Sequence, residues 1–310
     1  MIVFIYTLAI TSSFKVFPDV PEPTLKEDQV LIEIKAIALN FFDILQVQGK
    51  HQAKPSFPFI PGGDRVFGSS LGCFAERIAI SCKNVHLIPD HDMSYEEAAG
   101  IFVTYPTSYA GLVVRGNLKK AAGGVGIAAV QIAKALGAKV IACCGSNEKL
   151  EIAKEYGADY AINYKENKDW YKDVLKITNG HGVDVVYDPV GMIQPSIKCI
   201  AWNGRLVVIG FAAGNIEKIP MNLVLLKNIS LTGLHWGEYS KHDEQETIQM
   251  VWNGIFDLLK KKELKPLIYK KIYYGLENIK VGLNDIASRK TFGKVIVIPH
   301  QQSQQIKSKL

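Results

Sequence analysis

The feature that most constrains the fold of this chain is the stretch 121–144, AAGGVGIAAVQIAKALGAKVIACC. It contains a glycine-rich turn, an amphipathic helix, a glycine stop and an apolar strand. Gly123 and Gly126 match the second and third glycines of the dinucleotide-binding fingerprint. The second glycine lets backbone approach a pyrophosphate, and the third lets the helix lie close to the sheet. Ala121 stands where the first glycine is usual.

The helix in this stretch strengthens the interpretation. Its apolar residues recur at helical spacing and form a packing face: Val125, Ala129, Ile132 and Leu136. Gly137 fits a left-handed helix end. The N-terminus of the helix offers free N–H groups and a positive dipole end to a phosphate. The stretch therefore predicts a dinucleotide site, and the plainer alternative is an ordinary β-α-β turn without a ligand.

The residues that follow the strand, about 20 positions on, distinguish the two nicotinamide cofactors. An NAD site places Asp or Glu there, whereas this chain has CGSNEK at 144–149. Ser146 can donate a hydrogen bond and Lys149 supplies a cation, which together suit a 2′-phosphate and favour NADPH. Two alternatives stay open: Glu148 takes the part of the acid if the loop turns, and Lys149 is only a solvated lysine.

Length and composition set the broad class. The 310 residues have room for two domains. A content of 48% apolar and 21% charged residues is typical of a soluble globular protein, and no run of 18 or more apolar residues indicates a membrane span. The opening 1–10 is interpreted as a strand, with a degenerate signal peptide as the weaker alternative. The five cysteines form no CxxC pair, which argues against disulfides and structural zinc and indicates a reducing compartment.

The net charge of +6 is unevenly placed, because residues 260–310 hold twelve Lys and Arg against three Asp and Glu. These lysines are interleaved with apolar residues, so a solvated face or attraction for anionic substrates is favoured over nucleic-acid binding. The chain ends in Ser308, Lys309 and Leu310, which match a peroxisomal import address read by a receptor. The alternatives are a merely solubilising tail and a cytoplasmic location.

The pattern along the chain predicts an α/β protein with a small, mostly β first domain. Ser94 predicts a helix N-cap. Continuous apolar runs, as parallel sheets require, and helical patterns follow Thr104: strands at 160–164, 183–188 and 205–210, and helices at 147–156 and 247–262. Short strands return beyond Pro266. We therefore expect a first domain over 1–103, a dinucleotide-binding domain over 104–263, a return to the first domain over 264–299 and a flexible tail over 300–310.

Several motifs together resemble the zinc-free quinone oxidoreductases, the zeta-crystallin-like group of the medium-chain dehydrogenase/reductase superfamily. The resemblance covers about 21–299 and rests on these segments: NFFD at 40–43, FVTYPTSY at 102–109, 121–137, 183–191, GRLVVIGF at 204–211, LKNISLTG at 226–233 and GKV at 293–295. It implies a GroES-like catalytic domain and a Rossmann domain with a doubly wound parallel sheet, the active site in the cleft between them, and a homodimer.

The resemblance also implies roles for individual residues. Asn40 and Thr107 would orient the nicotinamide. The remaining cofactor contacts would be Gly123, Gly124 and Val125 at the pyrophosphate, Ser146, Lys149 and Tyr164 at the 2′-phosphate end, Gly210 and Phe211 near the nicotinamide ribose, and Lys294 from the returning strand. Singly, each residue has a structural alternative: Asn40 caps a turn, Tyr164 lies in the core, or Phe211 only packs.

The zinc-dependent relatives place a Cys and a Gly-His-Glu where this chain has Asn40 and 61–63, and their four-cysteine lobe is absent here. Without a metal to polarise an alcohol, the resemblance implies hydride transfer from NADPH to a quinone or an α,β-unsaturated carbonyl compound. An enoyl-CoA-like substrate is an alternative. No general acid is obvious; Tyr105, Tyr109 and His51 are candidates, and solvent is the alternative donor.

Two departures from the family pattern are expected to matter. The apolar strand that relatives have before the glycine-rich turn is missing, since Lys120 runs directly into Ala121; about nine residues are lacking by normal strand lengths. Part of the β domain is also missing after Gly63. Loss of the first Rossmann strand would leave two neighbouring strands unpaired. A non-catalytic, NADPH-binding or structural relative is therefore the rival hypothesis.

Overall fold

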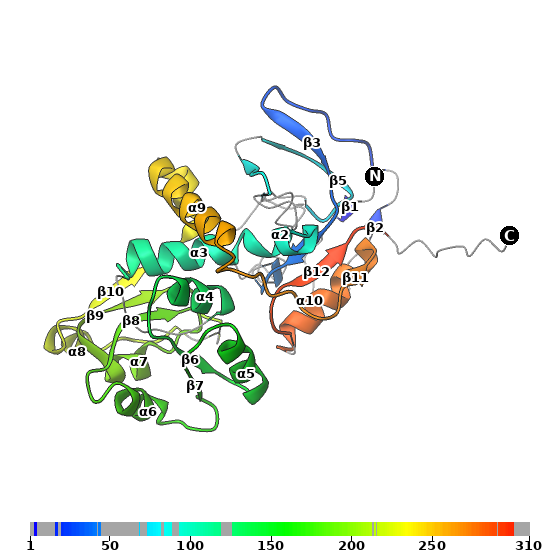
Figure 1. Cartoon of the computed structure of the whole chain (residues 1–310). Helices are drawn as coiled ribbons and strands as arrows, with labels where there is room; N and C mark the ends of the chain where they lie inside the picture. The colour runs from blue at the N-terminus through cyan, green and yellow to red at the C-terminus, as the bar shows by residue number, and fades with distance from the viewer. Residues whose placement is uncertain are drawn as a thin grey trace. The chain divides into compact units, whose positions relative to one another are not determined.

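We describe the protein from a computed structural model. The residues that it describes are 3–4, 16–17, 20–41, 43–44, 68, 73–81, 84–88, 93–118, 126–212, 214, 216–289 and 291–300. The chain forms two compact units (Figure 1): unit 1 combines Met1–Val103 with Pro266–Leu310, and unit 2 is Thr104–Lys265. The second boundary falls two residues beyond the expected end of the dinucleotide-binding domain at 263. Each unit is treated separately below.

Unit 1 is built mainly from short strands. Its elements are β1 (Val3–Phe4), β2 (Val16–Phe17), β3 (Gln29–Glu33), β4 (Ile37–Leu39), β5 (Arg77–Ser81), α2 (Tyr95–Ile101), β11 (Tyr273–Tyr274), the 3₁₀ turn η4 (Leu276–Asn278), α10 (Ile279–Ala287) and β12 (Val295–Ile298). Antiparallel pairs join β1 to β2, β3 to β5 and β4 to β12, and β11 lies parallel to β12. The end of the chain thus completes a sheet begun near residue 37.

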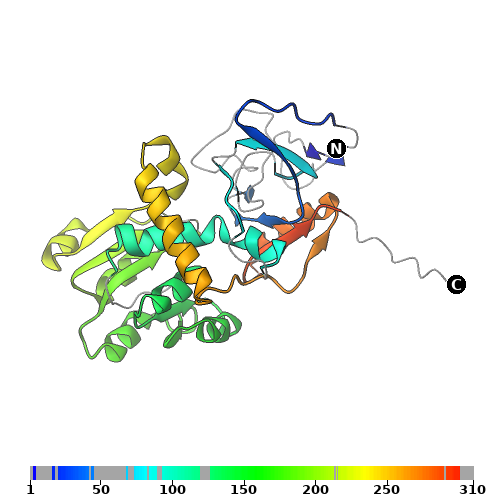
Figure 2. The same cartoon turned by 45° about the horizontal axis from the view of Figure 1, so that its top comes forward.

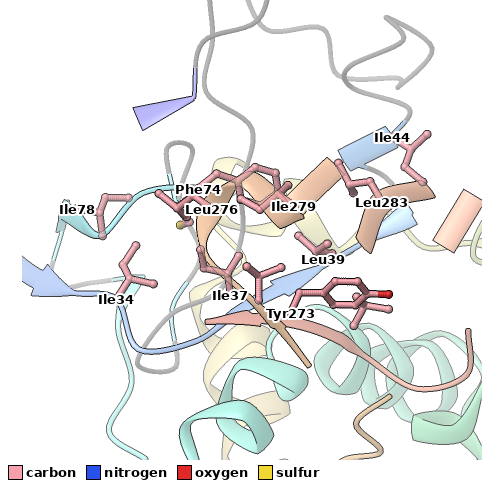
Figure 3. Close-up of a cluster of buried hydrophobic side chains, with 13 residues drawn as sticks. Ile34, Ile37, Leu39, Ile44, Phe74, Ile78, Tyr273, Leu276, Ile279 and Leu283 are labelled. Atoms are coloured by element: carbon pink, nitrogen blue, oxygen red, sulfur yellow. The ribbon is translucent and has the colours of Figure 1, made fainter. Parts of the chain in front are cut away.

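One apolar cluster forms the core of unit 1 (Figure 3). Ile37 and Leu39 of β4 pack with Phe74 and with Ile279 and Leu283 of α10. These side chains come from distant parts of the sequence, and the antiparallel register of β4 on β12 brings them together. The predicted N-cap at Ser94 is confirmed at the start of α2, where Ser94 and Glu97 form a reciprocal capping box.

Unit 2 alternates helices and strands. Its elements are α3 (Thr104–Tyr109), the π-helical η2 (Ala110–Arg115), α4 (Ile127–Ala135), β6 (Ile141–Cys144), α5 (Asn147–Glu155), β7 (Tyr160–Asn163), α6 (Trp170–Ile177), β8 (Val183–Asp188), α7 (Ile193–Cys199), β9 (Ile200–Val208), α8 (Met221–Leu226), β10 (Ser230–Gly233), the 3₁₀ turn η3 (Trp236–Lys241) and α9 (Gln245–Lys260). Among the residues described, no helix has both the length and the apolar content that a bilayer span requires.

The helix of the central stretch begins and ends at the glycines that the sequence indicates. Gly126 has φ +88° immediately before α4, and Gly137 has φ +78° just after it, a left-handed conformation that glycine adopts without strain. Figures 1 and 2 show α9 crossing α3, and the two helices are in contact. At this contact Gly254 leaves room for the ring of Tyr109: a Cβ there would lie 2.2 Å from its hydroxyl oxygen.

The strands of unit 2 are all parallel but fall into two groups. β6 pairs with β7, and β9 lies between β8 and β10. Helices lie on both faces of the strands, with η2 against Tyr187 of β8 on one face and α7 against β8 and β9 on the other. In the described part of the chain, no backbone ladder joins β6 to β8.

Candidate functional site

In unit 1, two predicted site residues that are far apart in sequence meet. The Lys294 ammonium donates a hydrogen bond to Asn40 Oδ1, and both residues are largely buried, at 8% and 7% exposure. Asn40 Nδ2 donates to the Ala38 carbonyl at 3.2 Å, which fixes the amide orientation. The Asn40 backbone N–H donates to Asp43 Oδ2 at 2.7 Å. We call Asn40, Asp43 and Lys294 the buried cluster.

The buried cluster has unusual electrostatics. Asp43 is completely buried, and burial raises the pKa of its carboxyl group from 3.8 to about 7. The hydrogen bond from the Asn40 backbone and the positive charge of Lys294 oppose that rise in pKa. Because the charged form remains disfavoured, Asp43 takes up and loses its proton near neutral pH.

In unit 2, three predicted residues gather at the tip of β6. Ser146 precedes α5, Lys149 lies in the first turn of that helix, and Tyr164 follows β7. A Cβ on Gly145 would lie 2.9 Å from the Tyr164 hydroxyl oxygen and 3.2 Å from Lys165 Cε. The Tyr164 and Lys165 side chains therefore lie directly against the turn that joins β6 to α5.

The groups around this turn favour an anion. The positive charge of Lys149 acts on the Cys144 thiol, opposing the rise in pKa that burial causes there. Ser146 makes no side-chain cap bond to α5, and the helix N-terminus adds a positive dipole end. Glu166 lies close by but accepts a hydrogen bond from Asn147 Nδ2 at 2.9 Å. Glu148, the alternative acid, is exposed.

The remaining predicted residues of unit 2 lie elsewhere in that unit. Gly210 and Phe211 follow β9, and Phe211 packs against the apolar cluster that contains Ile197 and Leu206. This packing is the structural alternative that the sequence left open for Phe211. Thr107 lies half-buried on α3.

Several other predicted positions lie outside the described residues: Gly123, Gly124 and Val125 of the glycine-rich turn, His51, and the terminal Ser308, Lys309 and Leu310.

Of the two candidate general acids that are described, Tyr105 is buried and its hydroxyl accepts a hydrogen bond from Gln131 Nε2 at 3.1 Å. Burial raises the pKa of Tyr109, and the charge of Asp257 adds to that rise. The raised pKa makes Tyr109 a poor proton donor.

A pocket of about 540 Å³, part of it open to solvent, lies between the two groups of parallel strands in unit 2. Its walls include Ile141 of β6, Val183 of β8 and residues of α6 and α7. Polar groups on the walls have protein partners: the Asp188 carboxylate accepts three backbone N–H bonds, and Ser196 Oγ donates to Met192 O. The pocket is therefore chiefly apolar.

Two residues beside these sites received no role from the sequence. Asp43 belongs to the NFFD segment, but only burial shows that its carboxyl group is unusual. Lys165 directly follows Tyr164, and a second lysine so close to Lys149 was the available signal. Among the described residues, no three His, Cys, Asp or Glu side chains lie close enough together to hold a metal.

Parallel strands with helices on both faces in unit 2, and a small β unit completed by the end of the chain, define a two-domain dehydrogenase-type protein. Comparison with known proteins agrees. The family model described as zinc-binding dehydrogenase matches residues 124–253. A quinone oxidoreductase-like protein 2 homolog from Nematostella vectensis is 36% identical, over 88% of this chain and 82% of its own length. The quinone oxidoreductase-like protein 2 from Mus musculus is 33% identical, over 87% and 84%.

A solved structure extends the likeness to the whole fold. The quinone oxidoreductase from Thermus thermophilus, also solved in complex with NADPH, is 26% identical, with a TM-score of 0.83 over 96% of this chain and 100% of its own. The chain belongs to the quinone oxidoreductase-like group of the medium-chain dehydrogenase/reductase superfamily. Unit 2 is its Rossmann domain, unit 1 its GroES-like domain, and the family makes the chain an oxidoreductase.

Proposed function

We propose that the protein is an NADPH-dependent, zinc-independent reductase that transfers a hydride to a quinone or an α,β-unsaturated carbonyl compound. The observation that carries the proposal is the meeting of Ser146, Lys149, Tyr164 and Lys165 at the β6 tip, beside the N-terminus of α5. Two cations and two hydroxyl groups fit an adenosine 2′-phosphate, whereas a 2′-hydroxyl would need an acidic partner there.

Three residues would act at the other end of the cofactor. NADPH, when bound, supplies the hydride. Asn40 and Thr107 would orient the nicotinamide, and the Lys294 ammonium would stabilise negative charge that develops on the acceptor oxygen. Quinones and enones delocalise incoming charge through their own conjugation, so the protein has only to hold donor and acceptor in contact.

Independence from zinc is supported by the sequence at the metal positions of the relatives. Asn40 stands where they have a cysteine, and residues 61–63 are Pro-Gly-Gly where they have Gly-His-Glu. An asparagine amide and a glycine pair do not replace thiolate and imidazole as zinc ligands. Addition and removal of zinc are therefore expected to leave turnover unchanged.

Stopped-flow oxidation of NADPH tests the proposal directly. A quinone, an enone and an enoyl-CoA would be offered in turn to the full chain, and the acceptor with the highest kcat/KM identifies the substrate class. Faster reaction with the enoyl-CoA would replace the proposed acceptor by that alternative. Absence of turnover with all three would refute the enzymatic function.

Replacement of Lys149 by glutamate is expected to reverse the cofactor preference. The Lys149→Glu variant loses one cation at the β6 tip and places a carboxylate against the 2′-phosphate. We expect the Kd for NADPH to rise roughly 10- to 100-fold, while the Kd for NADH falls or stays constant. Titration of intrinsic fluorescence with each cofactor measures both constants.

The matched control is Lys154→Glu, which makes the same charge change on the same helix. Lys154 is exposed and pairs with Glu151 at 2.9 Å, away from the turn. The Lys154→Glu variant should leave the ratio of the Kd for NADPH to the Kd for NADH within about twofold of the wild-type ratio. Equal losses of NADPH affinity in both variants would show that Lys149 acts only through the overall charge of the protein.

A non-catalytic NADPH-binding protein is the second candidate, and the divided sheet of unit 2 favours it. In the part of the chain that the structure describes, β6 and β8 have no shared ladder, and the apolar pocket lies between them. This arrangement fits the loss of the first Rossmann strand, for which the sequence gives independent support at Lys120–Ala121. Tight binding of NADPH without turnover would establish this candidate.

Insertion of a strand at that junction is expected to strengthen cofactor binding. Nine residues with alternating Val, Ile and Thr, placed between Lys120 and Ala121, could pair with both β6 and β8 and fill apolar space. We expect the Tm to rise by several degrees and NADPH affinity to rise roughly tenfold. A nine-residue Gly-Ser insertion is the control, and equal effects of the two insertions would argue against a missing strand.

The terminal Ser308, Lys309 and Leu310 support a peroxisomal location for this reaction. Fusion of residues 300–310 to a fluorescent protein tests the address. A diffuse signal in cells would exclude this localisation and leave the proposed chemistry untouched.

A further inference from the structure

The apolar pocket of unit 2 lies between β6 and β8, and the proposed reaction does not use it. Ile141 and Cys143 of β6 line the pocket from one side, and Val183 and Tyr187 of β8 line it from the other. In the described part of the chain, β6 pairs only with β7, and β8 pairs only with β9. Each of the two strands therefore has one edge that faces the pocket.

The register of β6 on β7 shows which backbone groups lie on the pocket edge of β6. The carbonyl oxygens of Val140 and Cys144 accept backbone hydrogen bonds at 3.1 Å from the two ends of β7. Successive residues of a strand direct their N–H and C=O groups to opposite edges. Ile141 and Cys143 therefore direct theirs to the pocket edge, where no described residue bonds to them.

The pocket edge of β8 presents backbone groups in the same way. The Asp188 carbonyl oxygen accepts the Ile209 N–H at 2.8 Å at the end of β9, so Val185 and Tyr187 direct their N–H and C=O groups away from β9. Both residues are buried, and no described residue bonds to these groups. Buried backbone groups without a partner are costly. Two rows of backbone donors and acceptors thus flank the pocket.

The walls of the pocket show which side chains an occupant needs. Trp170 and Val174 of α6 are buried and apolar. The Asp188 carboxylate is already bonded to three backbone N–H groups. Burial raises the pKa of Cys199 to about 11 and also raises the pKa of Cys143, so both thiols are neutral at pH 7. The walls therefore favour an uncharged, apolar occupant.

We propose that this pocket binds an extended apolar segment of a partner protein, which adds as a strand between β6 and β8. Such a strand can pair with both edges at once, whereas a small apolar molecule leaves the backbone groups without partners. The lengths of β6 and β8, four and six residues, suit a core of about five residues in the added strand. Helices cover both faces of these strands, so the segment is apolar on both faces.

A synthetic peptide tests the proposal on the full chain. Its core is Val-Ile-Val-Ala-Val, and lysines at both ends keep it soluble. We expect saturable binding in isothermal titration calorimetry, and a Tm rise of roughly 3 °C at a peptide concentration about ten times the Kd. Absence of binding would overturn the proposal.

The matched control peptide carries N-methyl groups on alternate core residues, which removes ladder donors and keeps the side chains. It should bind at least about tenfold more weakly than the unmodified peptide. Equal binding of the two peptides would show that the pocket accepts any apolar molecule, and would overturn the addition of a strand.

Hydrogen exchange measured by mass spectrometry locates the bound peptide. Exchange should slow in residues 141–144 and 183–188, the two strands that flank the pocket, and stay unchanged in β10 at residues 230–233. The strand β10 ends its group in the described structure, so it is a second edge on which a peptide can pair. Slower exchange in β10 without a change in β6 and β8 would contradict the proposed site.

A variant of the pocket wall gives an independent test. Val174→Phe places a larger side chain in the pocket and should weaken peptide binding roughly tenfold, with a Tm close to that of the wild type. Leu175→Phe is the control, because Leu175 lies on the same helix but is not a wall of the pocket. It should change the Kd less than about twofold. Equal affinities in the wild type and both variants would place the peptide elsewhere and overturn the proposal.

Discussion

Replacement of Lys294 by methionine is expected to lower the kcat/KM for NADPH and a quinone roughly 10²- to 10³-fold, the usual cost of removing one oriented donor from a water-excluded site. Methionine fills most of the volume of the lysine stem but cannot donate to Asn40 Oδ1. The acceptor oxygen would lose its cation, and Asn40 would lose one of the bonds that orient it. Steady-state kinetics at pH 7 measures the effect.

The control for this variant is Lys271→Met. Lys271 belongs to the same unit but is exposed, with its ammonium 3.6 Å from Asp285, so its loss should change kcat/KM less than about twofold. If Lys294→Met kept more than half of the wild-type activity with a normal Tm, Lys294 would have no part in the reaction. A Tm decrease of many degrees would instead point to a structural role.

Substitution of Gly182 by alanine is expected to destabilise unit 2 by roughly 3–5 kcal/mol. Gly182 has φ +87°, which alone strains an alanine. Its Cβ would also lie 2.7 Å from the Cys199 carbonyl oxygen and 2.9 Å from the Ala201 nitrogen. Both are backbone atoms at the junction where α7 ends and β9 begins, so the backbone there would have to move. Urea denaturation, monitored by circular dichroism, would measure the decrease in the free energy of unfolding.

Gly180, two residues earlier, is a matched control because its φ is almost the same, +84°. A Cβ at Gly180 would have no heavy atom within 4 Å. Gly180→Ala should therefore cost only about 1 kcal/mol, the strain of the left-handed conformation without a clash. Similar losses at the two glycines would show that conformation, and not the contact with β9, makes Gly182 necessary.

These two glycines show where sequence reasoning ends. The segment 178–183 indicates a turn by its composition, but nothing in it tells which glycine touches another strand. The same holds at the β6 tip, where Ser146 and Lys149 were predicted from the residues that follow the strand, and Tyr164 from the family resemblance. The nearby Lys165 was not, since its approach to Gly145 depends on how β7 follows β6.

The sequence alone determined the elements that local forces specify. The helix over 147–156, the strand over 183–188 and the cap at Ser94 are confirmed because periodicity, turn residues and capping act within a few positions. Tertiary structure alone decided that Asn40 meets Lys294, 254 residues away, and that Asp43 is sealed from water. Burial and long-range pairing are properties of the packed chain, so the charge state of this site could not be deduced from residue order.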